Sequence, residues 1–447
     1  MMSERLLTYL DGKFIDIQNV ALDEFMKELV DSEFGGKDTL ASETTRKFIE
    51  RLGFMWDPLS VPGYLTFKPY AAFMEEATKK HIWEMVQNFC FKSGFPVQRI
   101  AGGDLYSLDK ELMKNHVVLA EEVGMYGDGL LKVTGNKILR FSGCSNKLSL
   151  LKQTNFDNKQ LPIGIFEISD SYRYEKEERL DYLVRNRLFH LPELHIVNEN
   201  LDKGLEMLLL GHHKMVADMA DHDLDFIMLF STTQRFLNEH KDFIDALCNN
   251  LSHRPIINAS EDDSCENGIV FDVEYKALMS NGSLVEIGTF QIDEGATGFA
   301  YDIRYNNKPV TTVHAVFFAS SVERTIFTYC DKTANSDYFL PDWLAPVQYR
   351  IIPASQEYCQ RADEIGNRLL PYFRTEVDDT NSSFHDKFNN AKDMMIENIV
   401  RVGNNVELYN WNNDTFEVFR IESITENRKK SFEINQFAPL RLSESVI

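Results

Sequence analysis

The stretch from residue 163 to residue 197 carries side chains that could handle a phosphorylated substrate. Its first half alternates apolar and polar residues, which is typical of a strand with one buried face, and ends at Arg173 and Glu175. A polar connection over residues 176–181 leads into a second strand, in which odd-numbered side chains should share a face. These are Arg185, Arg187, Phe189, Glu193 and His195. Guanidinium groups can hold the phosphates of a nucleoside triphosphate, and an aromatic ring can stack on a base. The simpler alternative is an antiparallel hairpin whose charges face solvent.

Length and composition indicate a globular chain. Its 447 residues suffice for two or three domains, and 43% hydrophobic and 12% aromatic residues exclude a disordered chain. No apolar run is long enough to cross a bilayer and the start lacks a signal-peptide pattern, so we predict a cytoplasmic protein without a membrane partner. The net charge of −22 disfavours nucleic-acid binding, because phosphate contacts require Lys and Arg, but it does not exclude a local basic track.

The six cysteines are scattered and include no CxxC pair, which argues against a disulfide framework in a long intracellular chain. They are Cys90, Cys144, Cys248, Cys265, Cys330 and Cys359. From the residues alone, each could be a packed thiol or a metal ligand.

The strand, loop and returning strand resemble motif 2 of class II aminoacyl-tRNA synthetases. That motif has an aromatic-Arg-x-Glu strand end, here Tyr172-Arg173-Tyr174-Glu175, and then Arg, Phe and an acid, here Arg185, Phe189 and Glu193. The following FHLPELHIV is similar to the Phe-Thr-Met-Pro-Asp-Met-His of archaeal-type threonyl-tRNA synthetases. The resemblance covers roughly residues 60–425.

Two further stretches resemble the other class II motifs. Residues 69–97 have the helix-then-strand pattern of motif 1, which forms the dimer interface in the family and so implies a homodimer, although the motif's closing proline is missing near Ile100. Residues 309–329 resemble motif 3, a strand leading into a helix that opens with Glu323-Arg324. Ser320 replaces the glycine expected there, and the interval from histidine to arginine is one residue longer than in the family.

The resemblance implies an α+β fold, in which a class II antiparallel sheet flanked by helices is followed by a C-terminal α/β anticodon-binding domain. We predict an N-terminal extension of unknown role over 1–60, a catalytic domain over 61–338 and an anticodon-binding-like domain over 339–447. The extension is too short for the editing domain of archaeal relatives, which implies a separate trans-editing protein. Residues 380–383 and 387–389 lack the charged patterns of the family's anticodon domain, so the tRNA recognised stays open.

The resemblance also assigns roles in handling ATP. Arg173 and Arg324 are the catalytic arginines, on the α-phosphate and on the outer phosphates, and Mg²⁺ bridges the phosphates. The ATP-binding residues are Glu175, Arg185, Phe189, which stacks on adenine, and Gln291, which also contacts the amino acid.

A zinc site follows from the same resemblance. Cys144, His195 and His314 would be brought together from three strands and bind one zinc per chain, with coordination left open for the amino and hydroxyl groups of threonine. Valine lacks the hydroxyl and would be rejected. Glu193 stands where the family has an aspartate that receives the substrate ammonium group, and its extra methylene could change which amino acid fits.

The implied function is that of a threonine–tRNA ligase of protein biosynthesis, which activates threonine with ATP, releases pyrophosphate and transfers the amino acid to the 3′ end of tRNA-Thr. Two alternatives stay open. One is a divergent paralogue that activates another amino acid or uses another acceptor. The other is a catalytically silent RNA-binding or regulatory protein.

Overall fold

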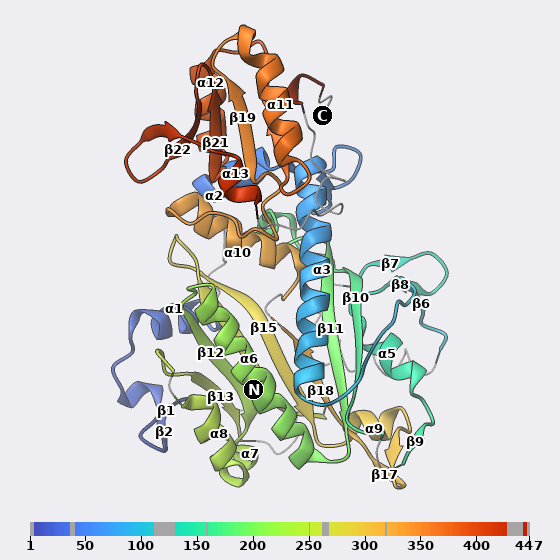
Figure 1. Ribbon diagram of the computed structural model, residues 1–447. Coiled ribbons are helices and arrows are strands. Elements are labelled where there is room, and N and C mark those ends of the chain that lie inside the picture. The colour runs from blue at the N-terminus through green and yellow to red at the C-terminus, as the bar shows by residue number, and fades with distance from the viewer. Residues whose placement is uncertain are drawn as a thin grey trace. The chain divides into compact units, whose positions relative to one another are not determined.

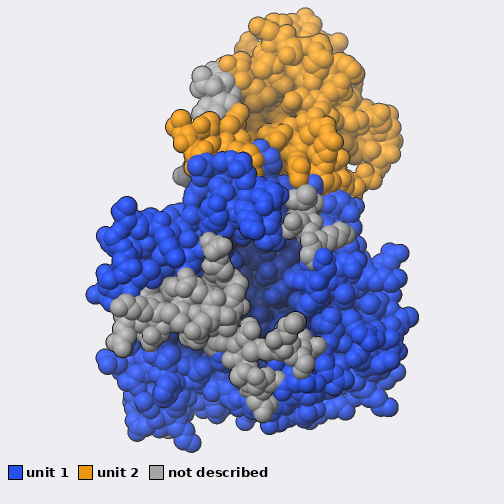
Figure 2. All heavy atoms as spheres, turned by 180° about the vertical axis from the view of Figure 1, so that it is seen from behind, with its two compact units in different colours: residues 1–41, 61–64, 79–325 blue, residues 42–60, 65–78, 326–447 orange. Residues whose placement is uncertain are grey.

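The computed structural model describes residues 4–35, 41–110, 130–157, 160–249, 251–261, 268–317, 320–426 and 441–444. The chain forms two compact units, one of residues 1–41, 61–64 and 79–325, the other of residues 42–60, 65–78 and 326–447 (Figure 2). These units divide the chain at positions other than the predicted domain boundaries, which stay a prediction.

A ten-stranded sheet runs through the first unit (Figure 1). Its strands in chain order are β1 (Glu4–Leu10), β2 (Lys13–Asp16), β5 (Val97–Arg99), β10 (Ile163–Tyr172), β11 (Leu188–Asn198), β12 (Phe226–Thr233), β13 (Ile256–Ser260), β14 (Ile269–Leu278), β15 (Leu284–Asp293) and β18 (Thr311–Val316). Their spatial order is β2-β1-β13-β12-β14-β15-β18-β11-β10-β5. All neighbours pair antiparallel except β12 with β13 and β10 with β5. The predicted antiparallel sheet is confirmed.

Helix α6 (Leu201–Asp221) covers one face of this sheet (Figure 1). The helix begins after Asn200, whose side chain accepts a hydrogen bond from the backbone N–H of Lys203. Its Gly211 lies so close to the sheet that a Cβ atom there would be 2.5 Å from the ring of Phe290. Because successive residues of a strand point to opposite faces, the next residue, Gln291, faces away from α6. The site described below lies on that other face.

The N-terminal segment, predicted only as an extension of unknown role, contains two strands that the sequence analysis missed. Strand β1 pairs with β13, and β2 pairs with β1 through a turn at Asp11 and Gly12. Both turn residues have positive φ, 49° and 74°, as the tightest hairpin turns require. The segment therefore extends the main sheet.

The second unit contains a five-stranded mixed sheet of order β20-β19-β21-β22-β23. The strands are β19 (Tyr349–Pro353), β20 (Thr375–Val377), β21 (Asn398–Val402), β22 (Val406–Asn410) and β23 (Thr415–Val418), with helices α11 (Cys359–Leu369) and α12 (Phe384–Asp393) between them. Strand β19 is parallel to β20 and β21, which confirms the predicted C-terminal α/β fold. Inside this unit Arg350, with 1% of its surface exposed, forms an ion pair with the fully buried Glu376.

The remaining elements are further helices and short strands outside these two sheets. The helices are α1 (Glu24–Glu33), α2 (Glu43–Arg51), α3 (Pro69–Lys92), α5 (Cys144–Leu150), α7 (Gln234–Glu239), α8 (Lys241–Cys248), α9 (Ala296–Ala300), α10 (Val322–Asn335) and α13 (Glu422–Thr425). The small strands are β3 (Phe54–Trp56), β4 (Leu65–Phe67), β6 (Leu105–Ser107), β7 (Lys132–Val133), β8 (Lys137–Leu139), β9 (Asn155–Phe156), β16 (Arg304–Tyr305) and β17 (Lys308–Pro309). Helix α3 followed by β5 confirms the helix-then-strand pattern predicted over residues 69–97. Among the described helices, none combines the length and apolarity needed to cross a membrane.

Candidate functional site

A row of polar side chains crosses four neighbouring strands of the main sheet. His195 of β11 stands opposite His314 of β18, His314 opposite Gln291 of β15, and Gln291 opposite Asp272 of β14. Residues directly opposite each other on neighbouring strands point to the same face. The register therefore delivers all four side chains to the face that α6 leaves open.

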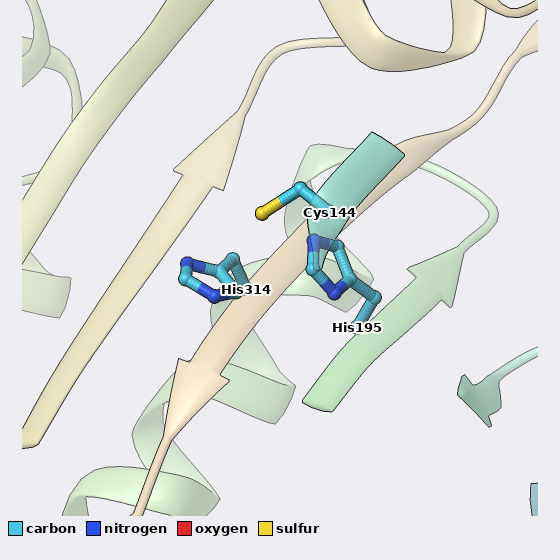
Figure 3. Close-up of side chains that lie close together, drawn as sticks. All are labelled: Cys144, His195 and His314. Carbon is cyan, nitrogen blue, oxygen red and sulfur yellow. The ribbon is translucent and has the colours of Figure 1, made fainter. Parts of the chain in front are cut away.

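Cys144 joins the two histidines at one end of this row. The side chains of Cys144, His195 and His314 point toward one another, and their ligand atoms all lie within 4.8 Å of one another (Figure 3). The three predicted residues are thus together, but the expectation of three strands was wrong for Cys144. This cysteine is the first residue of helix α5, after Gly143, so the sulfur is presented by a helix start and both imidazoles by strands.

This donor set fits a zinc ion. One sulfur and two imidazole nitrogens are typical zinc ligands. Nδ1 of His195 and Nε2 of His314 are buried and have no hydrogen-bond partner among the described residues. Burial, and after it the neighbouring His314 and Lys147, lowers the pKa of His195 well below its ordinary value. The imidazole is therefore neutral, which is the form that binds metal.

His314 is oriented by a chain of hydrogen bonds along the row. Its Nδ1 lies 3.1 Å from Oε1 of Gln291, whose Nε2 donates to Oδ2 of Asp272 at 2.9 Å. The other oxygen of Asp272 accepts a hydrogen bond from the hydroxyl of Thr289, also at 2.9 Å. Because Gln291 uses its NH₂ group on Asp272, its oxygen accepts the Nδ1 proton of His314, and Nε2 keeps an electron pair for a metal.

Glu193 lies beside the same three residues, with only 1% of its surface exposed. Its Oε2 accepts hydrogen bonds from the backbone N–H of Gly143 and from Nζ of Lys147, both at 2.8 Å. Its Oε1 accepts from Sγ of Cys144 at 3.3 Å and lies 3.5 Å from Nε2 of His314. Burial alone would raise the pKa of Glu193, but Lys147 and then His314 lower it well below the usual value. Glu193 is therefore a carboxylate with one oxygen facing the metal ligands.

All ten predicted site residues line a single cavity of about 690 Å³. They are Cys144, Arg173, Glu175, Arg185, Phe189, Glu193, His195, Gln291, His314 and Arg324. Ser320, the replacement for the expected glycine, lines it too, and residues 318–319 lie outside the described residues, as does Cys265. Side chains from distant parts of the chain thus meet in one place, although what each of them binds stays a prediction.

The motif 2 side chains form the part of the cavity suited to a nucleotide. The guanidinium carbon of Arg173 lies 5.0 Å from the ring centre of Phe189, over its face. Nη1 of Arg185 lies 3.4 Å from Oε2 of Glu175. A cation over one face of an aromatic ring still leaves the other face for stacking.

The motif 3 arginine has an acidic partner that the sequence analysis did not identify. Arg324 donates from Nε to the carbonyl oxygen of Val184 at 3.0 Å, and its Nη1 lies 3.4 Å from Oε2 of Glu286. Burial would raise the pKa of Glu286, but Arg324 and then Lys276 lower it. Glu286 therefore carries a charge that holds Arg324 at the cavity wall. Nothing in the sequence distinguishes a strand glutamate that pairs with a motif 3 arginine from any other strand glutamate.

Arg187 does not lie where strand alternation predicted. Strand β11 begins only at Leu188, so the two-residue alternation does not extend back to Arg187. Its Nε donates to the backbone oxygen of Glu175 at 3.0 Å and its Nη1 to that of Pro62 at 2.9 Å. The Arg187 side chain is buried and connects the loop segments that contain Pro62 and Glu175 through these hydrogen bonds.

Comparisons with known proteins agree with the fold and with the family resemblance. The chain is 29% identical over 412 residues to a threonine–tRNA ligase of Staphylothermus marinus and 28% identical over 411 residues to one of Thermofilum pendens. Both alignments cover 88% of this chain but only 64% and 65% of the relatives, so the chain spans less than two thirds of their length. The solved structure of the RNA-binding domain of a Cryptosporidium parvum threonyl-tRNA synthetase aligns with 85% of this chain and 96% of its own, with a TM-score of 0.68 and 16% identity. No family model matches the chain.

Proposed function

We propose, because this chain is a homologue of archaeal threonine–tRNA ligases and has the class II aminoacyl-tRNA synthetase fold, that it activates threonine with ATP and transfers it to tRNA. One observation carries the proposal. The metal-ligand set of Cys144, His195 and His314 opens into the same cavity as the motif 2 and motif 3 arginines, Arg173 and Arg324. An amino acid and a nucleotide bound at these two places would share that cavity.

At the metal end, the three ligands would hold one zinc ion per chain. Zinc, when bound, supplies a Lewis acid that can accept the amino and hydroxyl groups of an amino acid. Gln291 orients His314 through the 3.1 Å contact with Nδ1. Valine would be rejected because it offers no hydroxyl, whereas serine has one and would not be rejected. The proposal therefore includes a separate editing protein that removes serine from tRNA.

At the nucleotide end, ATP enters as its Mg²⁺ complex. Phe189 stacks on adenine while Glu175 accepts a hydrogen bond from the adenine amino group. A carboxylate oxygen of threonine attacks the α-phosphorus, the bond to the bridging oxygen breaks, and pyrophosphate leaves. Arg173 neutralises charge that develops at the α-phosphate, and Arg185 and Arg324 hold the departing outer phosphates. A hydroxyl of the tRNA 3′-terminal adenosine then attacks the adenylate carbonyl, giving aminoacyl-tRNA and AMP.

A second candidate is activation of another amino acid. It is favoured by Glu193, whose Oε1 faces the metal ligands on a side chain one methylene longer than the family's aspartate. The homodimer, the identity of the tRNA and the anticodon-binding role of residues 339–447 belong to the proposal as well.

The test is ATP–pyrophosphate exchange with each of the twenty amino acids, with zinc quantified in the same preparation. We expect exchange with threonine and one zinc per chain. A Cys144→Ser variant should lose both, whereas Cys248→Ser, which alters a cysteine on α8 that does not line the cavity, should lose neither. Exchange with a different amino acid would establish the second candidate. Zinc without any exchange would favour a silent RNA-binding paralogue and overturn both.

A further inference from the structure

Lys147 is a fully buried lysine, with 0% of its surface exposed, and it does not line the cavity. It stands three residues after Cys144 on helix α5. Its ammonium nitrogen lies 2.8 Å from Oε2 of Glu193 and 3.7 Å from Oε2 of Glu167. A buried ammonium group is costly unless it is paired, so these two carboxylates explain its position.

The more distant carboxylate has its own cation. Nη1 of Arg140 lies 2.8 Å from Oε1 of Glu167, and the backbone N–H of Gly102 donates to the same oxygen at 2.7 Å. Nη2 of the same arginine pairs with Asp104 at 2.8 Å, but that carboxylate is about half-exposed and is screened by solvent. Because Arg140 lies closer to Glu167 than Lys147 does, the charge of Lys147 is left mainly to balance Glu193.

Gly143 completes the support of Glu193. Its N–H donates to Oε2, and a Cβ atom at this position would lie 2.5 Å from that oxygen and 2.7 Å from Nζ of Lys147. Only a residue without a side chain therefore fits here. With Oε2 held by Gly143 and Lys147, Oε1 is left facing Cys144 and His314 at 3.3 and 3.5 Å.

We propose that Lys147 is a positioning residue for the amino-acid end of the cavity. It fixes the Glu193 carboxylate so that Oε1 accepts a hydrogen bond from the polar hydrogens of the bound amino acid, and it balances the negative charge that a metal at Cys144, His195 and His314 would otherwise experience. The hydrogen bond from Glu193 to the amino acid rests on the proposed function, whereas the charge balance at the metal site does not.

The metal half is tested with Co²⁺ as the probe and a competing chelator in the full chain. Lys147→Met leaves the negative charge of Glu193 unbalanced and should tighten Co²⁺ binding by about tenfold. Glu193→Gln leaves the positive charge of Lys147 unbalanced and should weaken Co²⁺ binding by about tenfold. Effects of this size are usual for groups that support metal ligands. The double variant removes both charges and should bind Co²⁺ like the natural chain. Shifts of the two single variants in the same direction would overturn the proposal.

The amino-acid half is tested by the exchange reaction. In all three variants the KM for threonine should rise by about tenfold, the scale of one lost hydrogen bond to a charged group, while the KM for ATP stays unchanged. Lys203→Met, at an exposed lysine paired with Glu206 on α6, is the matched control and should change neither constant. Equal increases in both KM values, or an unchanged KM for threonine in folded Lys147→Met, would contradict the role.

Two further outcomes keep the test decisive. If Lys147→Met does not fold but the double variant with Glu193→Gln does, the result supports the pairing of Lys147 with Glu193. If neither variant folds, Lys147 has a packing role and the proposal is overturned. If the natural chain shows no exchange with threonine, the proposed function fails, but the opposite signs of the Co²⁺ shifts still decide whether Lys147 balances Glu193.

Discussion

Replacing Gln291 by leucine should weaken metal binding without disturbing the ligands themselves. The substitution removes the oxygen 3.1 Å from Nδ1 of His314 and the amide that anchors it to Asp272 at 2.9 Å. A buried N–H left without an acceptor costs about 1–3 kcal/mol. His314 can avoid that cost only by changing tautomer, which places the proton on the nitrogen that would bind the metal. Either way the apparent zinc affinity should fall by about tenfold to a hundredfold.

The assay is competition for zinc against a chromophoric chelator at constant pH, with folding checked by circular dichroism. Thr289→Val is the matched control, because Thr289 donates to the other oxygen of Asp272 at 2.9 Å and makes no described contact with His314. The control should bind zinc like the natural chain. A folded Gln291→Leu variant whose zinc affinity changes by less than about twofold, well under the usual effect of such supporting groups, would refute the assigned orientation of His314.

Three further predictions concern the nucleotide end and the stability of each unit. Phe189→Leu removes the ring over which Arg173 lies at 5.0 Å, so the KM for ATP should rise by about tenfold, as for a lost stacking contact, and an unchanged KM would contradict adenine stacking. Burial lowers the pKa of His212 from 6.5 to about 4. Between these values the unfolded chain binds more protons, so the free energy of unfolding should fall by up to about 3 kcal/mol as pH drops from 6.5 to 4. Denaturation at pH 7 and pH 5 should show about 2 kcal/mol of this loss, and His212→Gln should reduce it. Arg350→Met leaves Glu376 buried without its cation and should destabilise the second unit by about 3–5 kcal/mol, whereas adding Glu376→Gln should recover most of that loss in urea unfolding.

Motif spacing predicted the cavity well because each motif is local. Arg173 and Glu175 follow the end of β10, and Phe189 and Glu193 lie within β11, so a short pattern is enough to bring them together across one hairpin. The contact between this hairpin and His314 could not be predicted in the same way. It depends on the pairing of β11 with β18, strands more than a hundred residues apart in the sequence, which no spacing rule contains. The resemblance to a known family supplied that part.

The misses have separate physical causes. Asp11-Gly12, preceded by Tyr9-Leu10 and followed after Lys13 by Phe14-Ile15, is a strong hairpin signal that the sequence carries. Alternation failed at Arg187 because a period of two holds only inside a strand, and the strand begins one residue later. Helix α5 starts at Cys144, directly after Gly143. Glycine has no side chain that could accept a hydrogen bond from the first turn, so no capping side chain indicates this helix start in the sequence. Each of these errors lies at the edge of a regular element, where hydrogen bonding and not periodicity sets the conformation.

The partners of Glu193 change how its departure from the family's aspartate should be interpreted. Taken alone, one extra methylene moves a carboxylate by about 1.5 Å and predicts a changed amino-acid pocket. In the fold, that carboxylate reaches the backbone of Gly143 and the ammonium group of Lys147, both within 2.8 Å. The longer side chain therefore extends to groups at the start of α5, and its remaining oxygen is still directed at the metal ligands. Glu193, Gly143 and Lys147 form one unit, so testing Glu193→Asp alone would measure the loss of these contacts together with any change in specificity. Only variants that also alter Lys147 can separate the two effects.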